Sequence, residues 1–123
     1  MTDRKMTEEA LFEMKKDHES LEQEENTIKK TKKRISNFME EWQRLNNAEM
    51  EILDEVAFLS QGTHSEGHAL RSLDEREIVI GQTRSMVDFE LDELDHKQKC
   101  LRMEIDDLES DIDRQQKAVY EDA

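Results

Sequence analysis

Residues that break helices are almost missing from this chain of 123 residues, which has no proline and only three glycines. Two of these glycines, Gly62 and Gly67, lie in one short polar segment, so a helix can run unbroken on either side of it. Aromatic residues make up 5% of the chain and hydrophobic residues 34%, whereas charged residues make up 41%. This composition is typical of long helices rather than of a compact enzyme-like core.

Cysteines and long apolar runs are also scarce. The single cysteine, Cys100, excludes an internal disulfide and suits a reducing compartment. No segment approaches the ~20 consecutive apolar residues that span a bilayer, and the residues after Met1 form no apolar signal-peptide region. We therefore expect a cytoplasmic protein without membrane insertion, and any export has to proceed without a cleaved signal peptide.

Positive charge is in short supply, because 18 Lys and Arg face 32 Asp and Glu, for a net charge of −14. This imbalance argues against nucleic acid as a partner, since proteins neutralise its phosphates with Lys and Arg. The one basic cluster runs from Lys29 to Arg34. It is either a solvated stripe that pairs with acidic neighbours or a contact for phosphate or lipid.

What the chain does have is two ladders of apolar residues spaced by seven. The first ladder consists of Met14, Leu21, Ile28, Ile35, Trp42, Glu49 and Val56, with one polar rung. The second consists of Leu73, Ile80, Val87, Leu94, Leu101 and Leu108. A sustained seven-residue repeat is typical of helices that pack along a narrow coiled-coil seam.

The ladders predict one all-α domain over residues 1–123, an antiparallel two-helix hairpin of coiled-coil type. We expect helix 1 at about 5–60, a loop at about 61–68 and helix 2 at about 69–119. A short loop makes the two helices antiparallel neighbours, with level residues whose numbers sum to about 129. A stagger of half a heptad either way stays open. The predicted hairpin core is Leu21, Ile28, Ile35, Trp42, Val56, Leu73, Ile80, Val87, Leu94, Leu101 and Leu108.

Each seam needs a second apolar position, and here the two halves of helix 1 differ. Near the loop the sequence offers Phe38, Met39, Leu45, Ile52, Leu53 and Leu59. Far from the loop the same position is filled by His18, Glu25 and Lys32. Polar residues at seam positions fix register or partner choice and lower stability, so we expect a thin seam in that half.

Further large apolar residues near the loop fall outside the ladders, on helix flanks that a two-helix hairpin leaves exposed. They are Met50, Phe58, Ile78, Val79, Met86 and Phe89. One interpretation is a locally widened core. The interpretation that we prefer is a second interface, which binds further helices in a four-helix or larger assembly.

Signs of chemistry are few. His64 and His68 have a spacing that can place two imidazoles on one metal, but Gly67 lies between them and no cysteine joins them. No phosphate loop, zinc-protease motif or nucleophile motif occurs. We predict no enzyme activity, no catalytic residues, no metal and no cofactor.

A small acidic helical hairpin with a spare apolar flank resembles the WXG-type and ESX-like proteins of type VII secretion. Its length and its Glu- and Leu-rich heptads resemble more closely the small helical accessory proteins of LXG toxins in Gram-positive bacteria. In such systems the accessory protein binds the helical N-terminal region of the toxin and acts as its targeting chaperone. The resemblance implies a heteromeric helical complex, commonly with a second small helical protein.

The motifs of these families are matched only in part. The loop has no Trp-x-Gly, because Trp42 lies inside helix 1 and is followed by Gln43 and Arg44. The export motif, an aromatic followed four residues later by an acid, is matched by Phe89 and Glu93. The resemblance therefore adds Glu93 to the expected partner-binding residues. The alternative is a homodimer or larger homo-oligomer that serves as a coiled-coil spacer, for example in a phage or cytoskeletal assembly.

Overall fold

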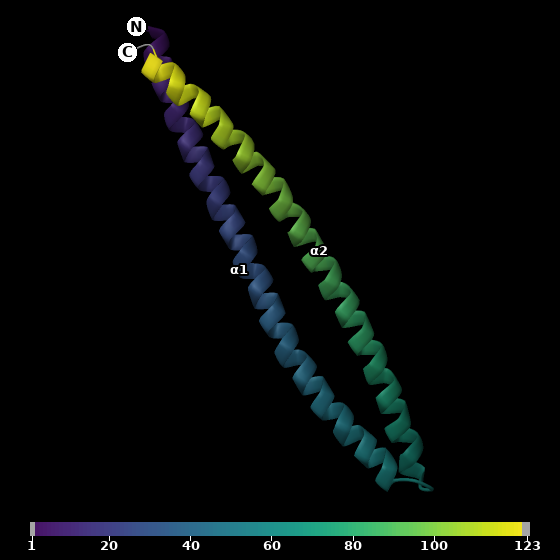
Figure 1. Ribbon diagram of the computed structural model, residues 1–123. Coiled ribbons are helices and arrows are strands. Elements are labelled where there is room, and N and C mark those ends of the chain that lie inside the picture. The colour runs from purple at the N-terminus through teal and green to yellow at the C-terminus, as the bar shows by residue number, and fades with distance from the viewer. Residues whose placement is uncertain (1, 122–123) are drawn as a thin grey trace. The chain divides into compact units, whose positions relative to one another are not determined.

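The computed structural model describes residues 2–121, with side chains described for 8–121. It consists of two helices, α1 at Thr2–Leu59 and α2 at His64–Glu121 (Figure 1). No strand occurs within residues 2–121. The predicted all-α two-helix hairpin is confirmed. The loop is shorter than expected, since α2 begins at His64 and not near residue 69.

The chemistry of the loop explains why α2 starts so early. Gly62 takes the left-handed conformation, with φ at 78°, which ends α1 as glycine commonly does. Thr63 then caps α2, because its Oγ1 accepts a hydrogen bond from the Ser65 N–H at 3.3 Å. The Glu66 carboxylate reaches back and accepts one from the Gly62 N–H at 2.6 Å. Together these contacts resemble a capping box, so Gly67 lies inside the helix.

Two glycines test this account of the loop in opposite directions. Gly62→Ala is expected to lower the free energy of unfolding by about 1–2 kcal/mol, because a side chain disfavours the left-handed conformation. Gly81→Ala is expected to raise it by up to about 1 kcal/mol, because Gly81 lies inside α2 with nothing within 4 Å of an added Cβ. Urea unfolding followed by circular dichroism measures both. An equal effect of the two substitutions would contradict the assigned loop conformation.

The hairpin divides into two compact units, each built from one segment of α1 and one of α2. The terminal unit is Met1–Thr31 with Glu93–Ala123, and the loop unit is Lys32–Asp92. In the terminal unit, ion pairs join Glu25 to Arg102 and His18 to Glu109, so the residue numbers of each pair sum to 127. In the loop unit Glu49 pairs with Arg76, for a sum of 125. The sums of level residue numbers are thus two to four lower than the predicted sum of about 129.

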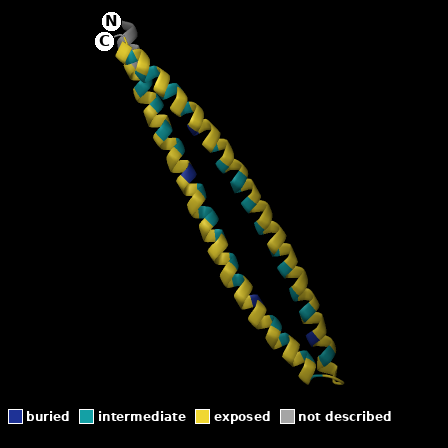
Figure 2. Ribbon diagram, in the orientation of Figure 1, coloured by how far each residue is buried: buried dark blue, intermediate teal, exposed yellow. Residues whose placement is uncertain are grey.

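The seam of the terminal unit is thin, as its polar positions suggest. Ile105 is its one fully buried side chain, at 0% exposure, and most of both helices is exposed (Figure 2). The predicted core residues of this unit are half-buried: Leu21, Ile28, Leu94, Leu101 and Leu108. Glu25 is buried at 7% exposure, with its carboxylate 3.2 Å from Lys29 Nζ and 3.6 Å from Arg102 Nη1. The seam therefore includes a buried charge.

This buried charge is expected to be dispensable for stability. Glu25→Leu should leave the melting temperature unchanged or raise it, because a buried ion pair is often no better than a packed apolar side chain. Lys29 and Arg102 are more than half exposed and remain solvated after the change. Glu24→Leu, at an exposed position, is the matched control and should have little effect. A marked drop in melting temperature for Glu25→Leu alone would show that the carboxylate holds the unit together.

The seam of the loop unit departs from the predicted ladder. Half-buried or buried positions in α1 step by three and four residues up to Asn46 and then make a second step of four to Met50. An extra four residues in a heptad pattern is a stutter, which turns the contact face of the helix. After it, the seam follows Leu53 and Ala57 instead of Glu49 and Val56.

Two predictions about α1 are therefore wrong. Val56 was expected in the core but is 43% exposed, because the stutter replaces it at the seam by Ala57. Met50 was expected on an exposed flank but is half-buried in the seam, for the same reason. The remaining predicted core residues of the loop unit are half-buried: Ile35, Trp42, Leu73, Ile80 and Val87.

Candidate partner-binding surface

Large exposed apolar side chains gather in the loop unit. Among the described side chains 14 such residues are exposed, and 11 of them belong to Lys32–Asp92. These 11 are Phe38, Leu45, Ile52, Val56, Phe58, Leu59, Leu70, Ile78, Val79, Met86 and Phe89. Single exposed apolar residues are ordinary, but a concentration of this kind marks an interaction surface.

Four of these residues form a stripe along α1. Phe38, Leu45, Ile52 and Leu59 are spaced by seven residues and each is well over half exposed. The sequence had suggested that they fill the second seam position, and that prediction is wrong. The seam position beside them is taken by Met39, Asn46 and Leu53, which are half-buried or buried. Asn46 is buried at this position and donates a hydrogen bond from Nδ2 to the Trp42 carbonyl at 2.8 Å.

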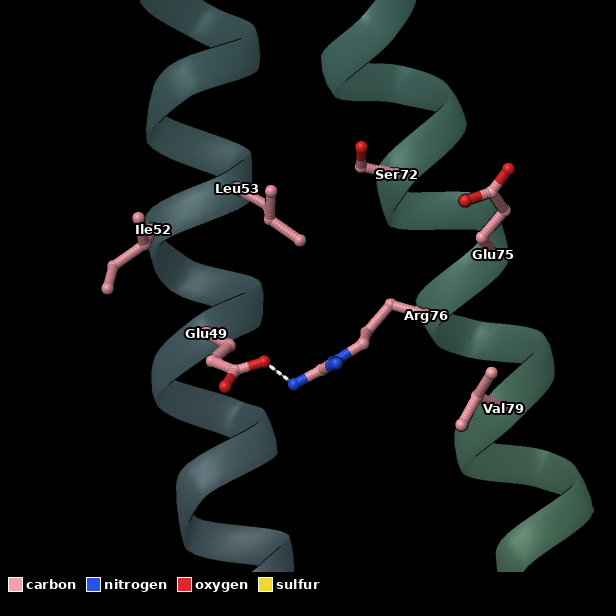
Figure 3. A pocket seen from close by; sticks show the side chains of 7 residues that line it. All are labelled: Glu49, Ile52, Leu53, Ser72, Glu75, Arg76 and Val79. Atoms are coloured by element: carbon pink, nitrogen blue, oxygen red, sulfur yellow. Dashed lines mark ion pairs between the residues drawn. The ribbon is translucent and has the colours of Figure 1, made fainter.

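The matching stripe on α2 comes from Val79 and Met86, also seven residues apart and both exposed. Two hollows between α1 and α2 are each lined by residues of both stripes, so the two stripes lie on one face. The first is lined by Glu49, Ile52, Leu53, Ser72, Glu75, Arg76 and Val79 (Figure 3). The second is lined by Arg34, Ile35, Phe38, Met86, Val87 and Glu90. We name this surface the loop-unit face and define it by Phe38, Leu45, Ile52, Leu59, Val79 and Met86.

The floor of the first hollow carries the ion pair between α1 and α2. Arg76 crosses from α2 to the Glu49 carboxylate, while Leu53 points toward α2 and Ile52 points away from it (Figure 3). Arg76 is half-buried, and its Nε is buried without a hydrogen-bond partner. Glu49 and Arg76 neutralise each other there, so the two leave no net charge on the floor of the hollow.

The predicted partner-binding residues divide between several positions. Val79 and Met86 line the hollows of the loop-unit face. Ile78 and Phe89 are exposed on α2, and since eleven residues make about three helical turns, they share its outer surface. Phe58 is exposed on α1 but, by helical periodicity, lies on the flank opposite the Phe38 stripe. Glu93 is exposed and belongs to the terminal unit, so its expected role lies outside the loop-unit face.

The residues that form the seam near the loop share one signal in the sequence. Asn46, Met50, Leu53 and Ala57 repeat the spacing of a seam whose phase differs from that of Val56. A seam that follows this second set turns the Phe38 stripe outward. This signal is masked because Phe38, Leu45, Ile52 and Leu59 are larger and more apolar than Asn46 and Ala57, and large apolar residues are the usual occupants of a core.

Groups that could bind a metal occur in the terminal unit. His18 Nε2 lies 3.0 Å from a Glu109 oxygen and 3.6 Å from a Glu22 oxygen, and one donor atom of each residue lies within 4.8 Å of the others. Both glutamates are exposed, and of the two only Glu109 lies within hydrogen-bond distance of His18 Nε2. The contact between His18 and Glu109 joins α1 to α2 without a metal. His64 and His68 are both exposed on α2, and His68 Nδ1 lies 3.2 Å from an Arg71 nitrogen.

Neither described helix contains a stretch that is long and apolar enough to cross a membrane.

Cys100 is a free, exposed thiol on α2, with its Sγ 3.8 Å from His96 Nε2. Comparison with models of protein families, with curated proteins and with solved structures finds no match for this chain.

Proposed function

We propose that this chain is a non-enzymatic adaptor that binds a helical segment of another protein through the loop-unit face. The observation that supports the proposal is the continuous apolar stripe on α1, seven-residue spaced and exposed, beside its counterpart on α2. Grooves between two helices with apolar anchors at such spacing are the usual docking sites for a third helix.

The energetics fit a specific but reversible complex. Fully burying a large apolar side chain contributes about 1.5–3 kcal/mol, and the six side chains of the face are mostly about half to three-quarters exposed. Their burial would yield roughly 5–13 kcal/mol, from which the loss of translational and rotational freedom has to be subtracted. The remaining contacts of the docked helix add to this apolar contribution. The expected dissociation constant of the complex is on the order of micromolar or lower.

The finer form of the proposal follows from the resemblance to accessory proteins of LXG toxins. In that form the partner is the helical N-terminal region of a secreted toxin, and the adaptor delivers it to a type VII secretion system. The exposed pair Phe89 and Glu93 would then serve as the export signal of the complex. A second small helical protein would complete the assembly.

The test is a binding experiment with a toxin encoded beside the gene for this chain. The helical N-terminal region of that toxin and the full chain are purified separately and mixed, and light scattering after gel filtration gives the mass. The proposal predicts a heteromeric complex of defined stoichiometry. A chain that ignores the toxin region and runs as a stable homo-oligomer would contradict it and favour a coiled-coil spacer.

A further inference from the structure

We infer that the helix bound by the loop-unit face is cationic along its flanks, with Lys or Arg on both sides of its apolar stripe. This inference rests on the proposed function and adds the chemistry of the partner. It excludes a second copy of this acidic chain as the preferred occupant.

The hollows open on the same face at a separation that suits a helix. Phe38 and Ile52 contribute one to each hollow and are 14 residues apart in α1, two heptads, which is about 21 Å along the axis. A helix that lies in the groove between α1 and α2 can insert one side chain in each hollow, also two heptads apart. Leu45 lies midway between Phe38 and Ile52 and is exposed, so it is placed to contact the docked helix between the two inserted side chains.

Acidic side chains surround the groove. Glu75 and Glu90 line its two hollows on the α2 side. On α1, Glu41 lies between Phe38 and Leu45 at helical spacing. These three carboxylates are exposed, and Arg34 is the basic residue that lines the second hollow. The groove therefore presents apolar anchors inside an acidic rim.

These charges lie where a docked helix places its own flanking residues. In coiled coils the residues beside the apolar stripe select the partner by charge, because opposite signs attract across the interface and like signs repel. A second copy of the chain would bring the same acidic rim against the first and join two chains of net charge −14. A helix with Lys or Arg in the flanking positions would instead meet three carboxylates and one guanidinium group, a net attraction.

Two synthetic helices test the inference on the full chain. Both peptides are about four heptads long with Leu and Ile at the seam positions; one carries Lys and the other Glu at all flanking positions. Isothermal titration in low salt is expected to show at least tenfold tighter binding of the Lys peptide, with an affinity that falls as salt is added. Equal affinities of the two peptides would overturn the cationic partner while leaving apolar docking intact.

Matched variants locate the effect. Glu75→Gln with Glu90→Gln removes two rim charges and is expected to reduce the preference for the Lys peptide by at least threefold. Glu40→Gln with Glu51→Gln removes two charges from the other flank of α1, where both residues line a separate hollow, and should leave the preference unchanged. An equal loss in both variants would show that net charge alone, and not the rim, selects the helix. Failure of both peptides to bind the unmodified chain would overturn the inference and the docking surface together, whereas a toxin region that still bound elsewhere would preserve the adaptor role.

Discussion

Replacing Met86 and Phe89 together by Ser is expected to weaken binding of the helical partner by at least about tenfold, or about 1.4 kcal/mol, through the loss of Met86 from the loop-unit face, and to leave the helix content of the isolated chain unchanged. Met86 is 70% exposed and lines a hollow of the loop-unit face, whereas Phe89 is exposed on the outer surface of α2, beyond that face. Neither side chain belongs to the seam that holds α1 and α2 together. Circular dichroism measures the helix content, and titration with the partner measures the affinity.

The chain offers a matched control for this pair. Phe12 and Met103 are one Phe and one Met, both 68% exposed, and both belong to the terminal unit. Phe12→Ser with Met103→Ser removes the same chemistry from the surface and should leave the affinity within about twofold, since such positions contribute little. Binding that survives the Met86 and Phe89 change, or that is lost equally in the control, would show that the partner does not use the loop-unit face.

Ile105→Ala is expected to have the largest effect on stability, a loss of about 2–5 kcal/mol. Ile105 is the one large side chain that is completely buried among those described. The seam around it is thin, and half-buried Gln98 and buried Glu25 occupy positions that apolar residues would otherwise fill. A cavity at this point removes a large fraction of the apolar contact between the α1 and α2 segments of the terminal unit. Because folded proteins are only marginally stable, this loss is large relative to the total free energy of unfolding.

Urea unfolding monitored by circular dichroism provides the measurement, and Met103→Ala provides the comparison. Met103 lies two residues from Ile105 in α2 but is exposed, so its truncation should change the free energy of unfolding by less than about 0.5 kcal/mol. If Ile105→Ala were as harmless as Met103→Ala, the terminal unit would not depend on this seam for its stability.

The hairpin itself could be predicted from the sequence because heptad spacing and helix breakers act locally. Seven-residue ladders on either side of Gly62 require two helices, and the short polar segment between them requires an antiparallel return. The first helical residue of α2 was misplaced for a local reason as well. Thr63 and Glu66 form the cap, whereas the two glycines, Gly62 and Gly67, suggested a loop at about 61–68.

The candidate site was predicted less well, because it depends on which of two overlapping stripes of α1 packs against α2. Near the loop α1 carries a large apolar stripe through Leu45 and Ile52 and a smaller one through Asn46 and Leu53. Size and hydrophobicity favour the first stripe for the core. Packing selects the second, since the seam close to the loop is built from small residues such as Ala57 and Ala69. The stripe is thus exposed because Met39, Asn46 and Leu53 take the seam position beside it, a choice that no single-helix pattern fixes.

Site-specific photo-crosslinking tests the central claim, that the loop-unit face binds a helix, most directly. A photoreactive amino acid replaces Leu45 in the middle of the α1 stripe, or Gln43 on the opposite flank of the same helix. Each variant is irradiated in complex with the purified helical region of the partner. The account predicts an efficient crosslink from position 45 and little or none from position 43. A crosslink from position 43 alone would contradict it, because the partner would then lie on the other side of the hairpin.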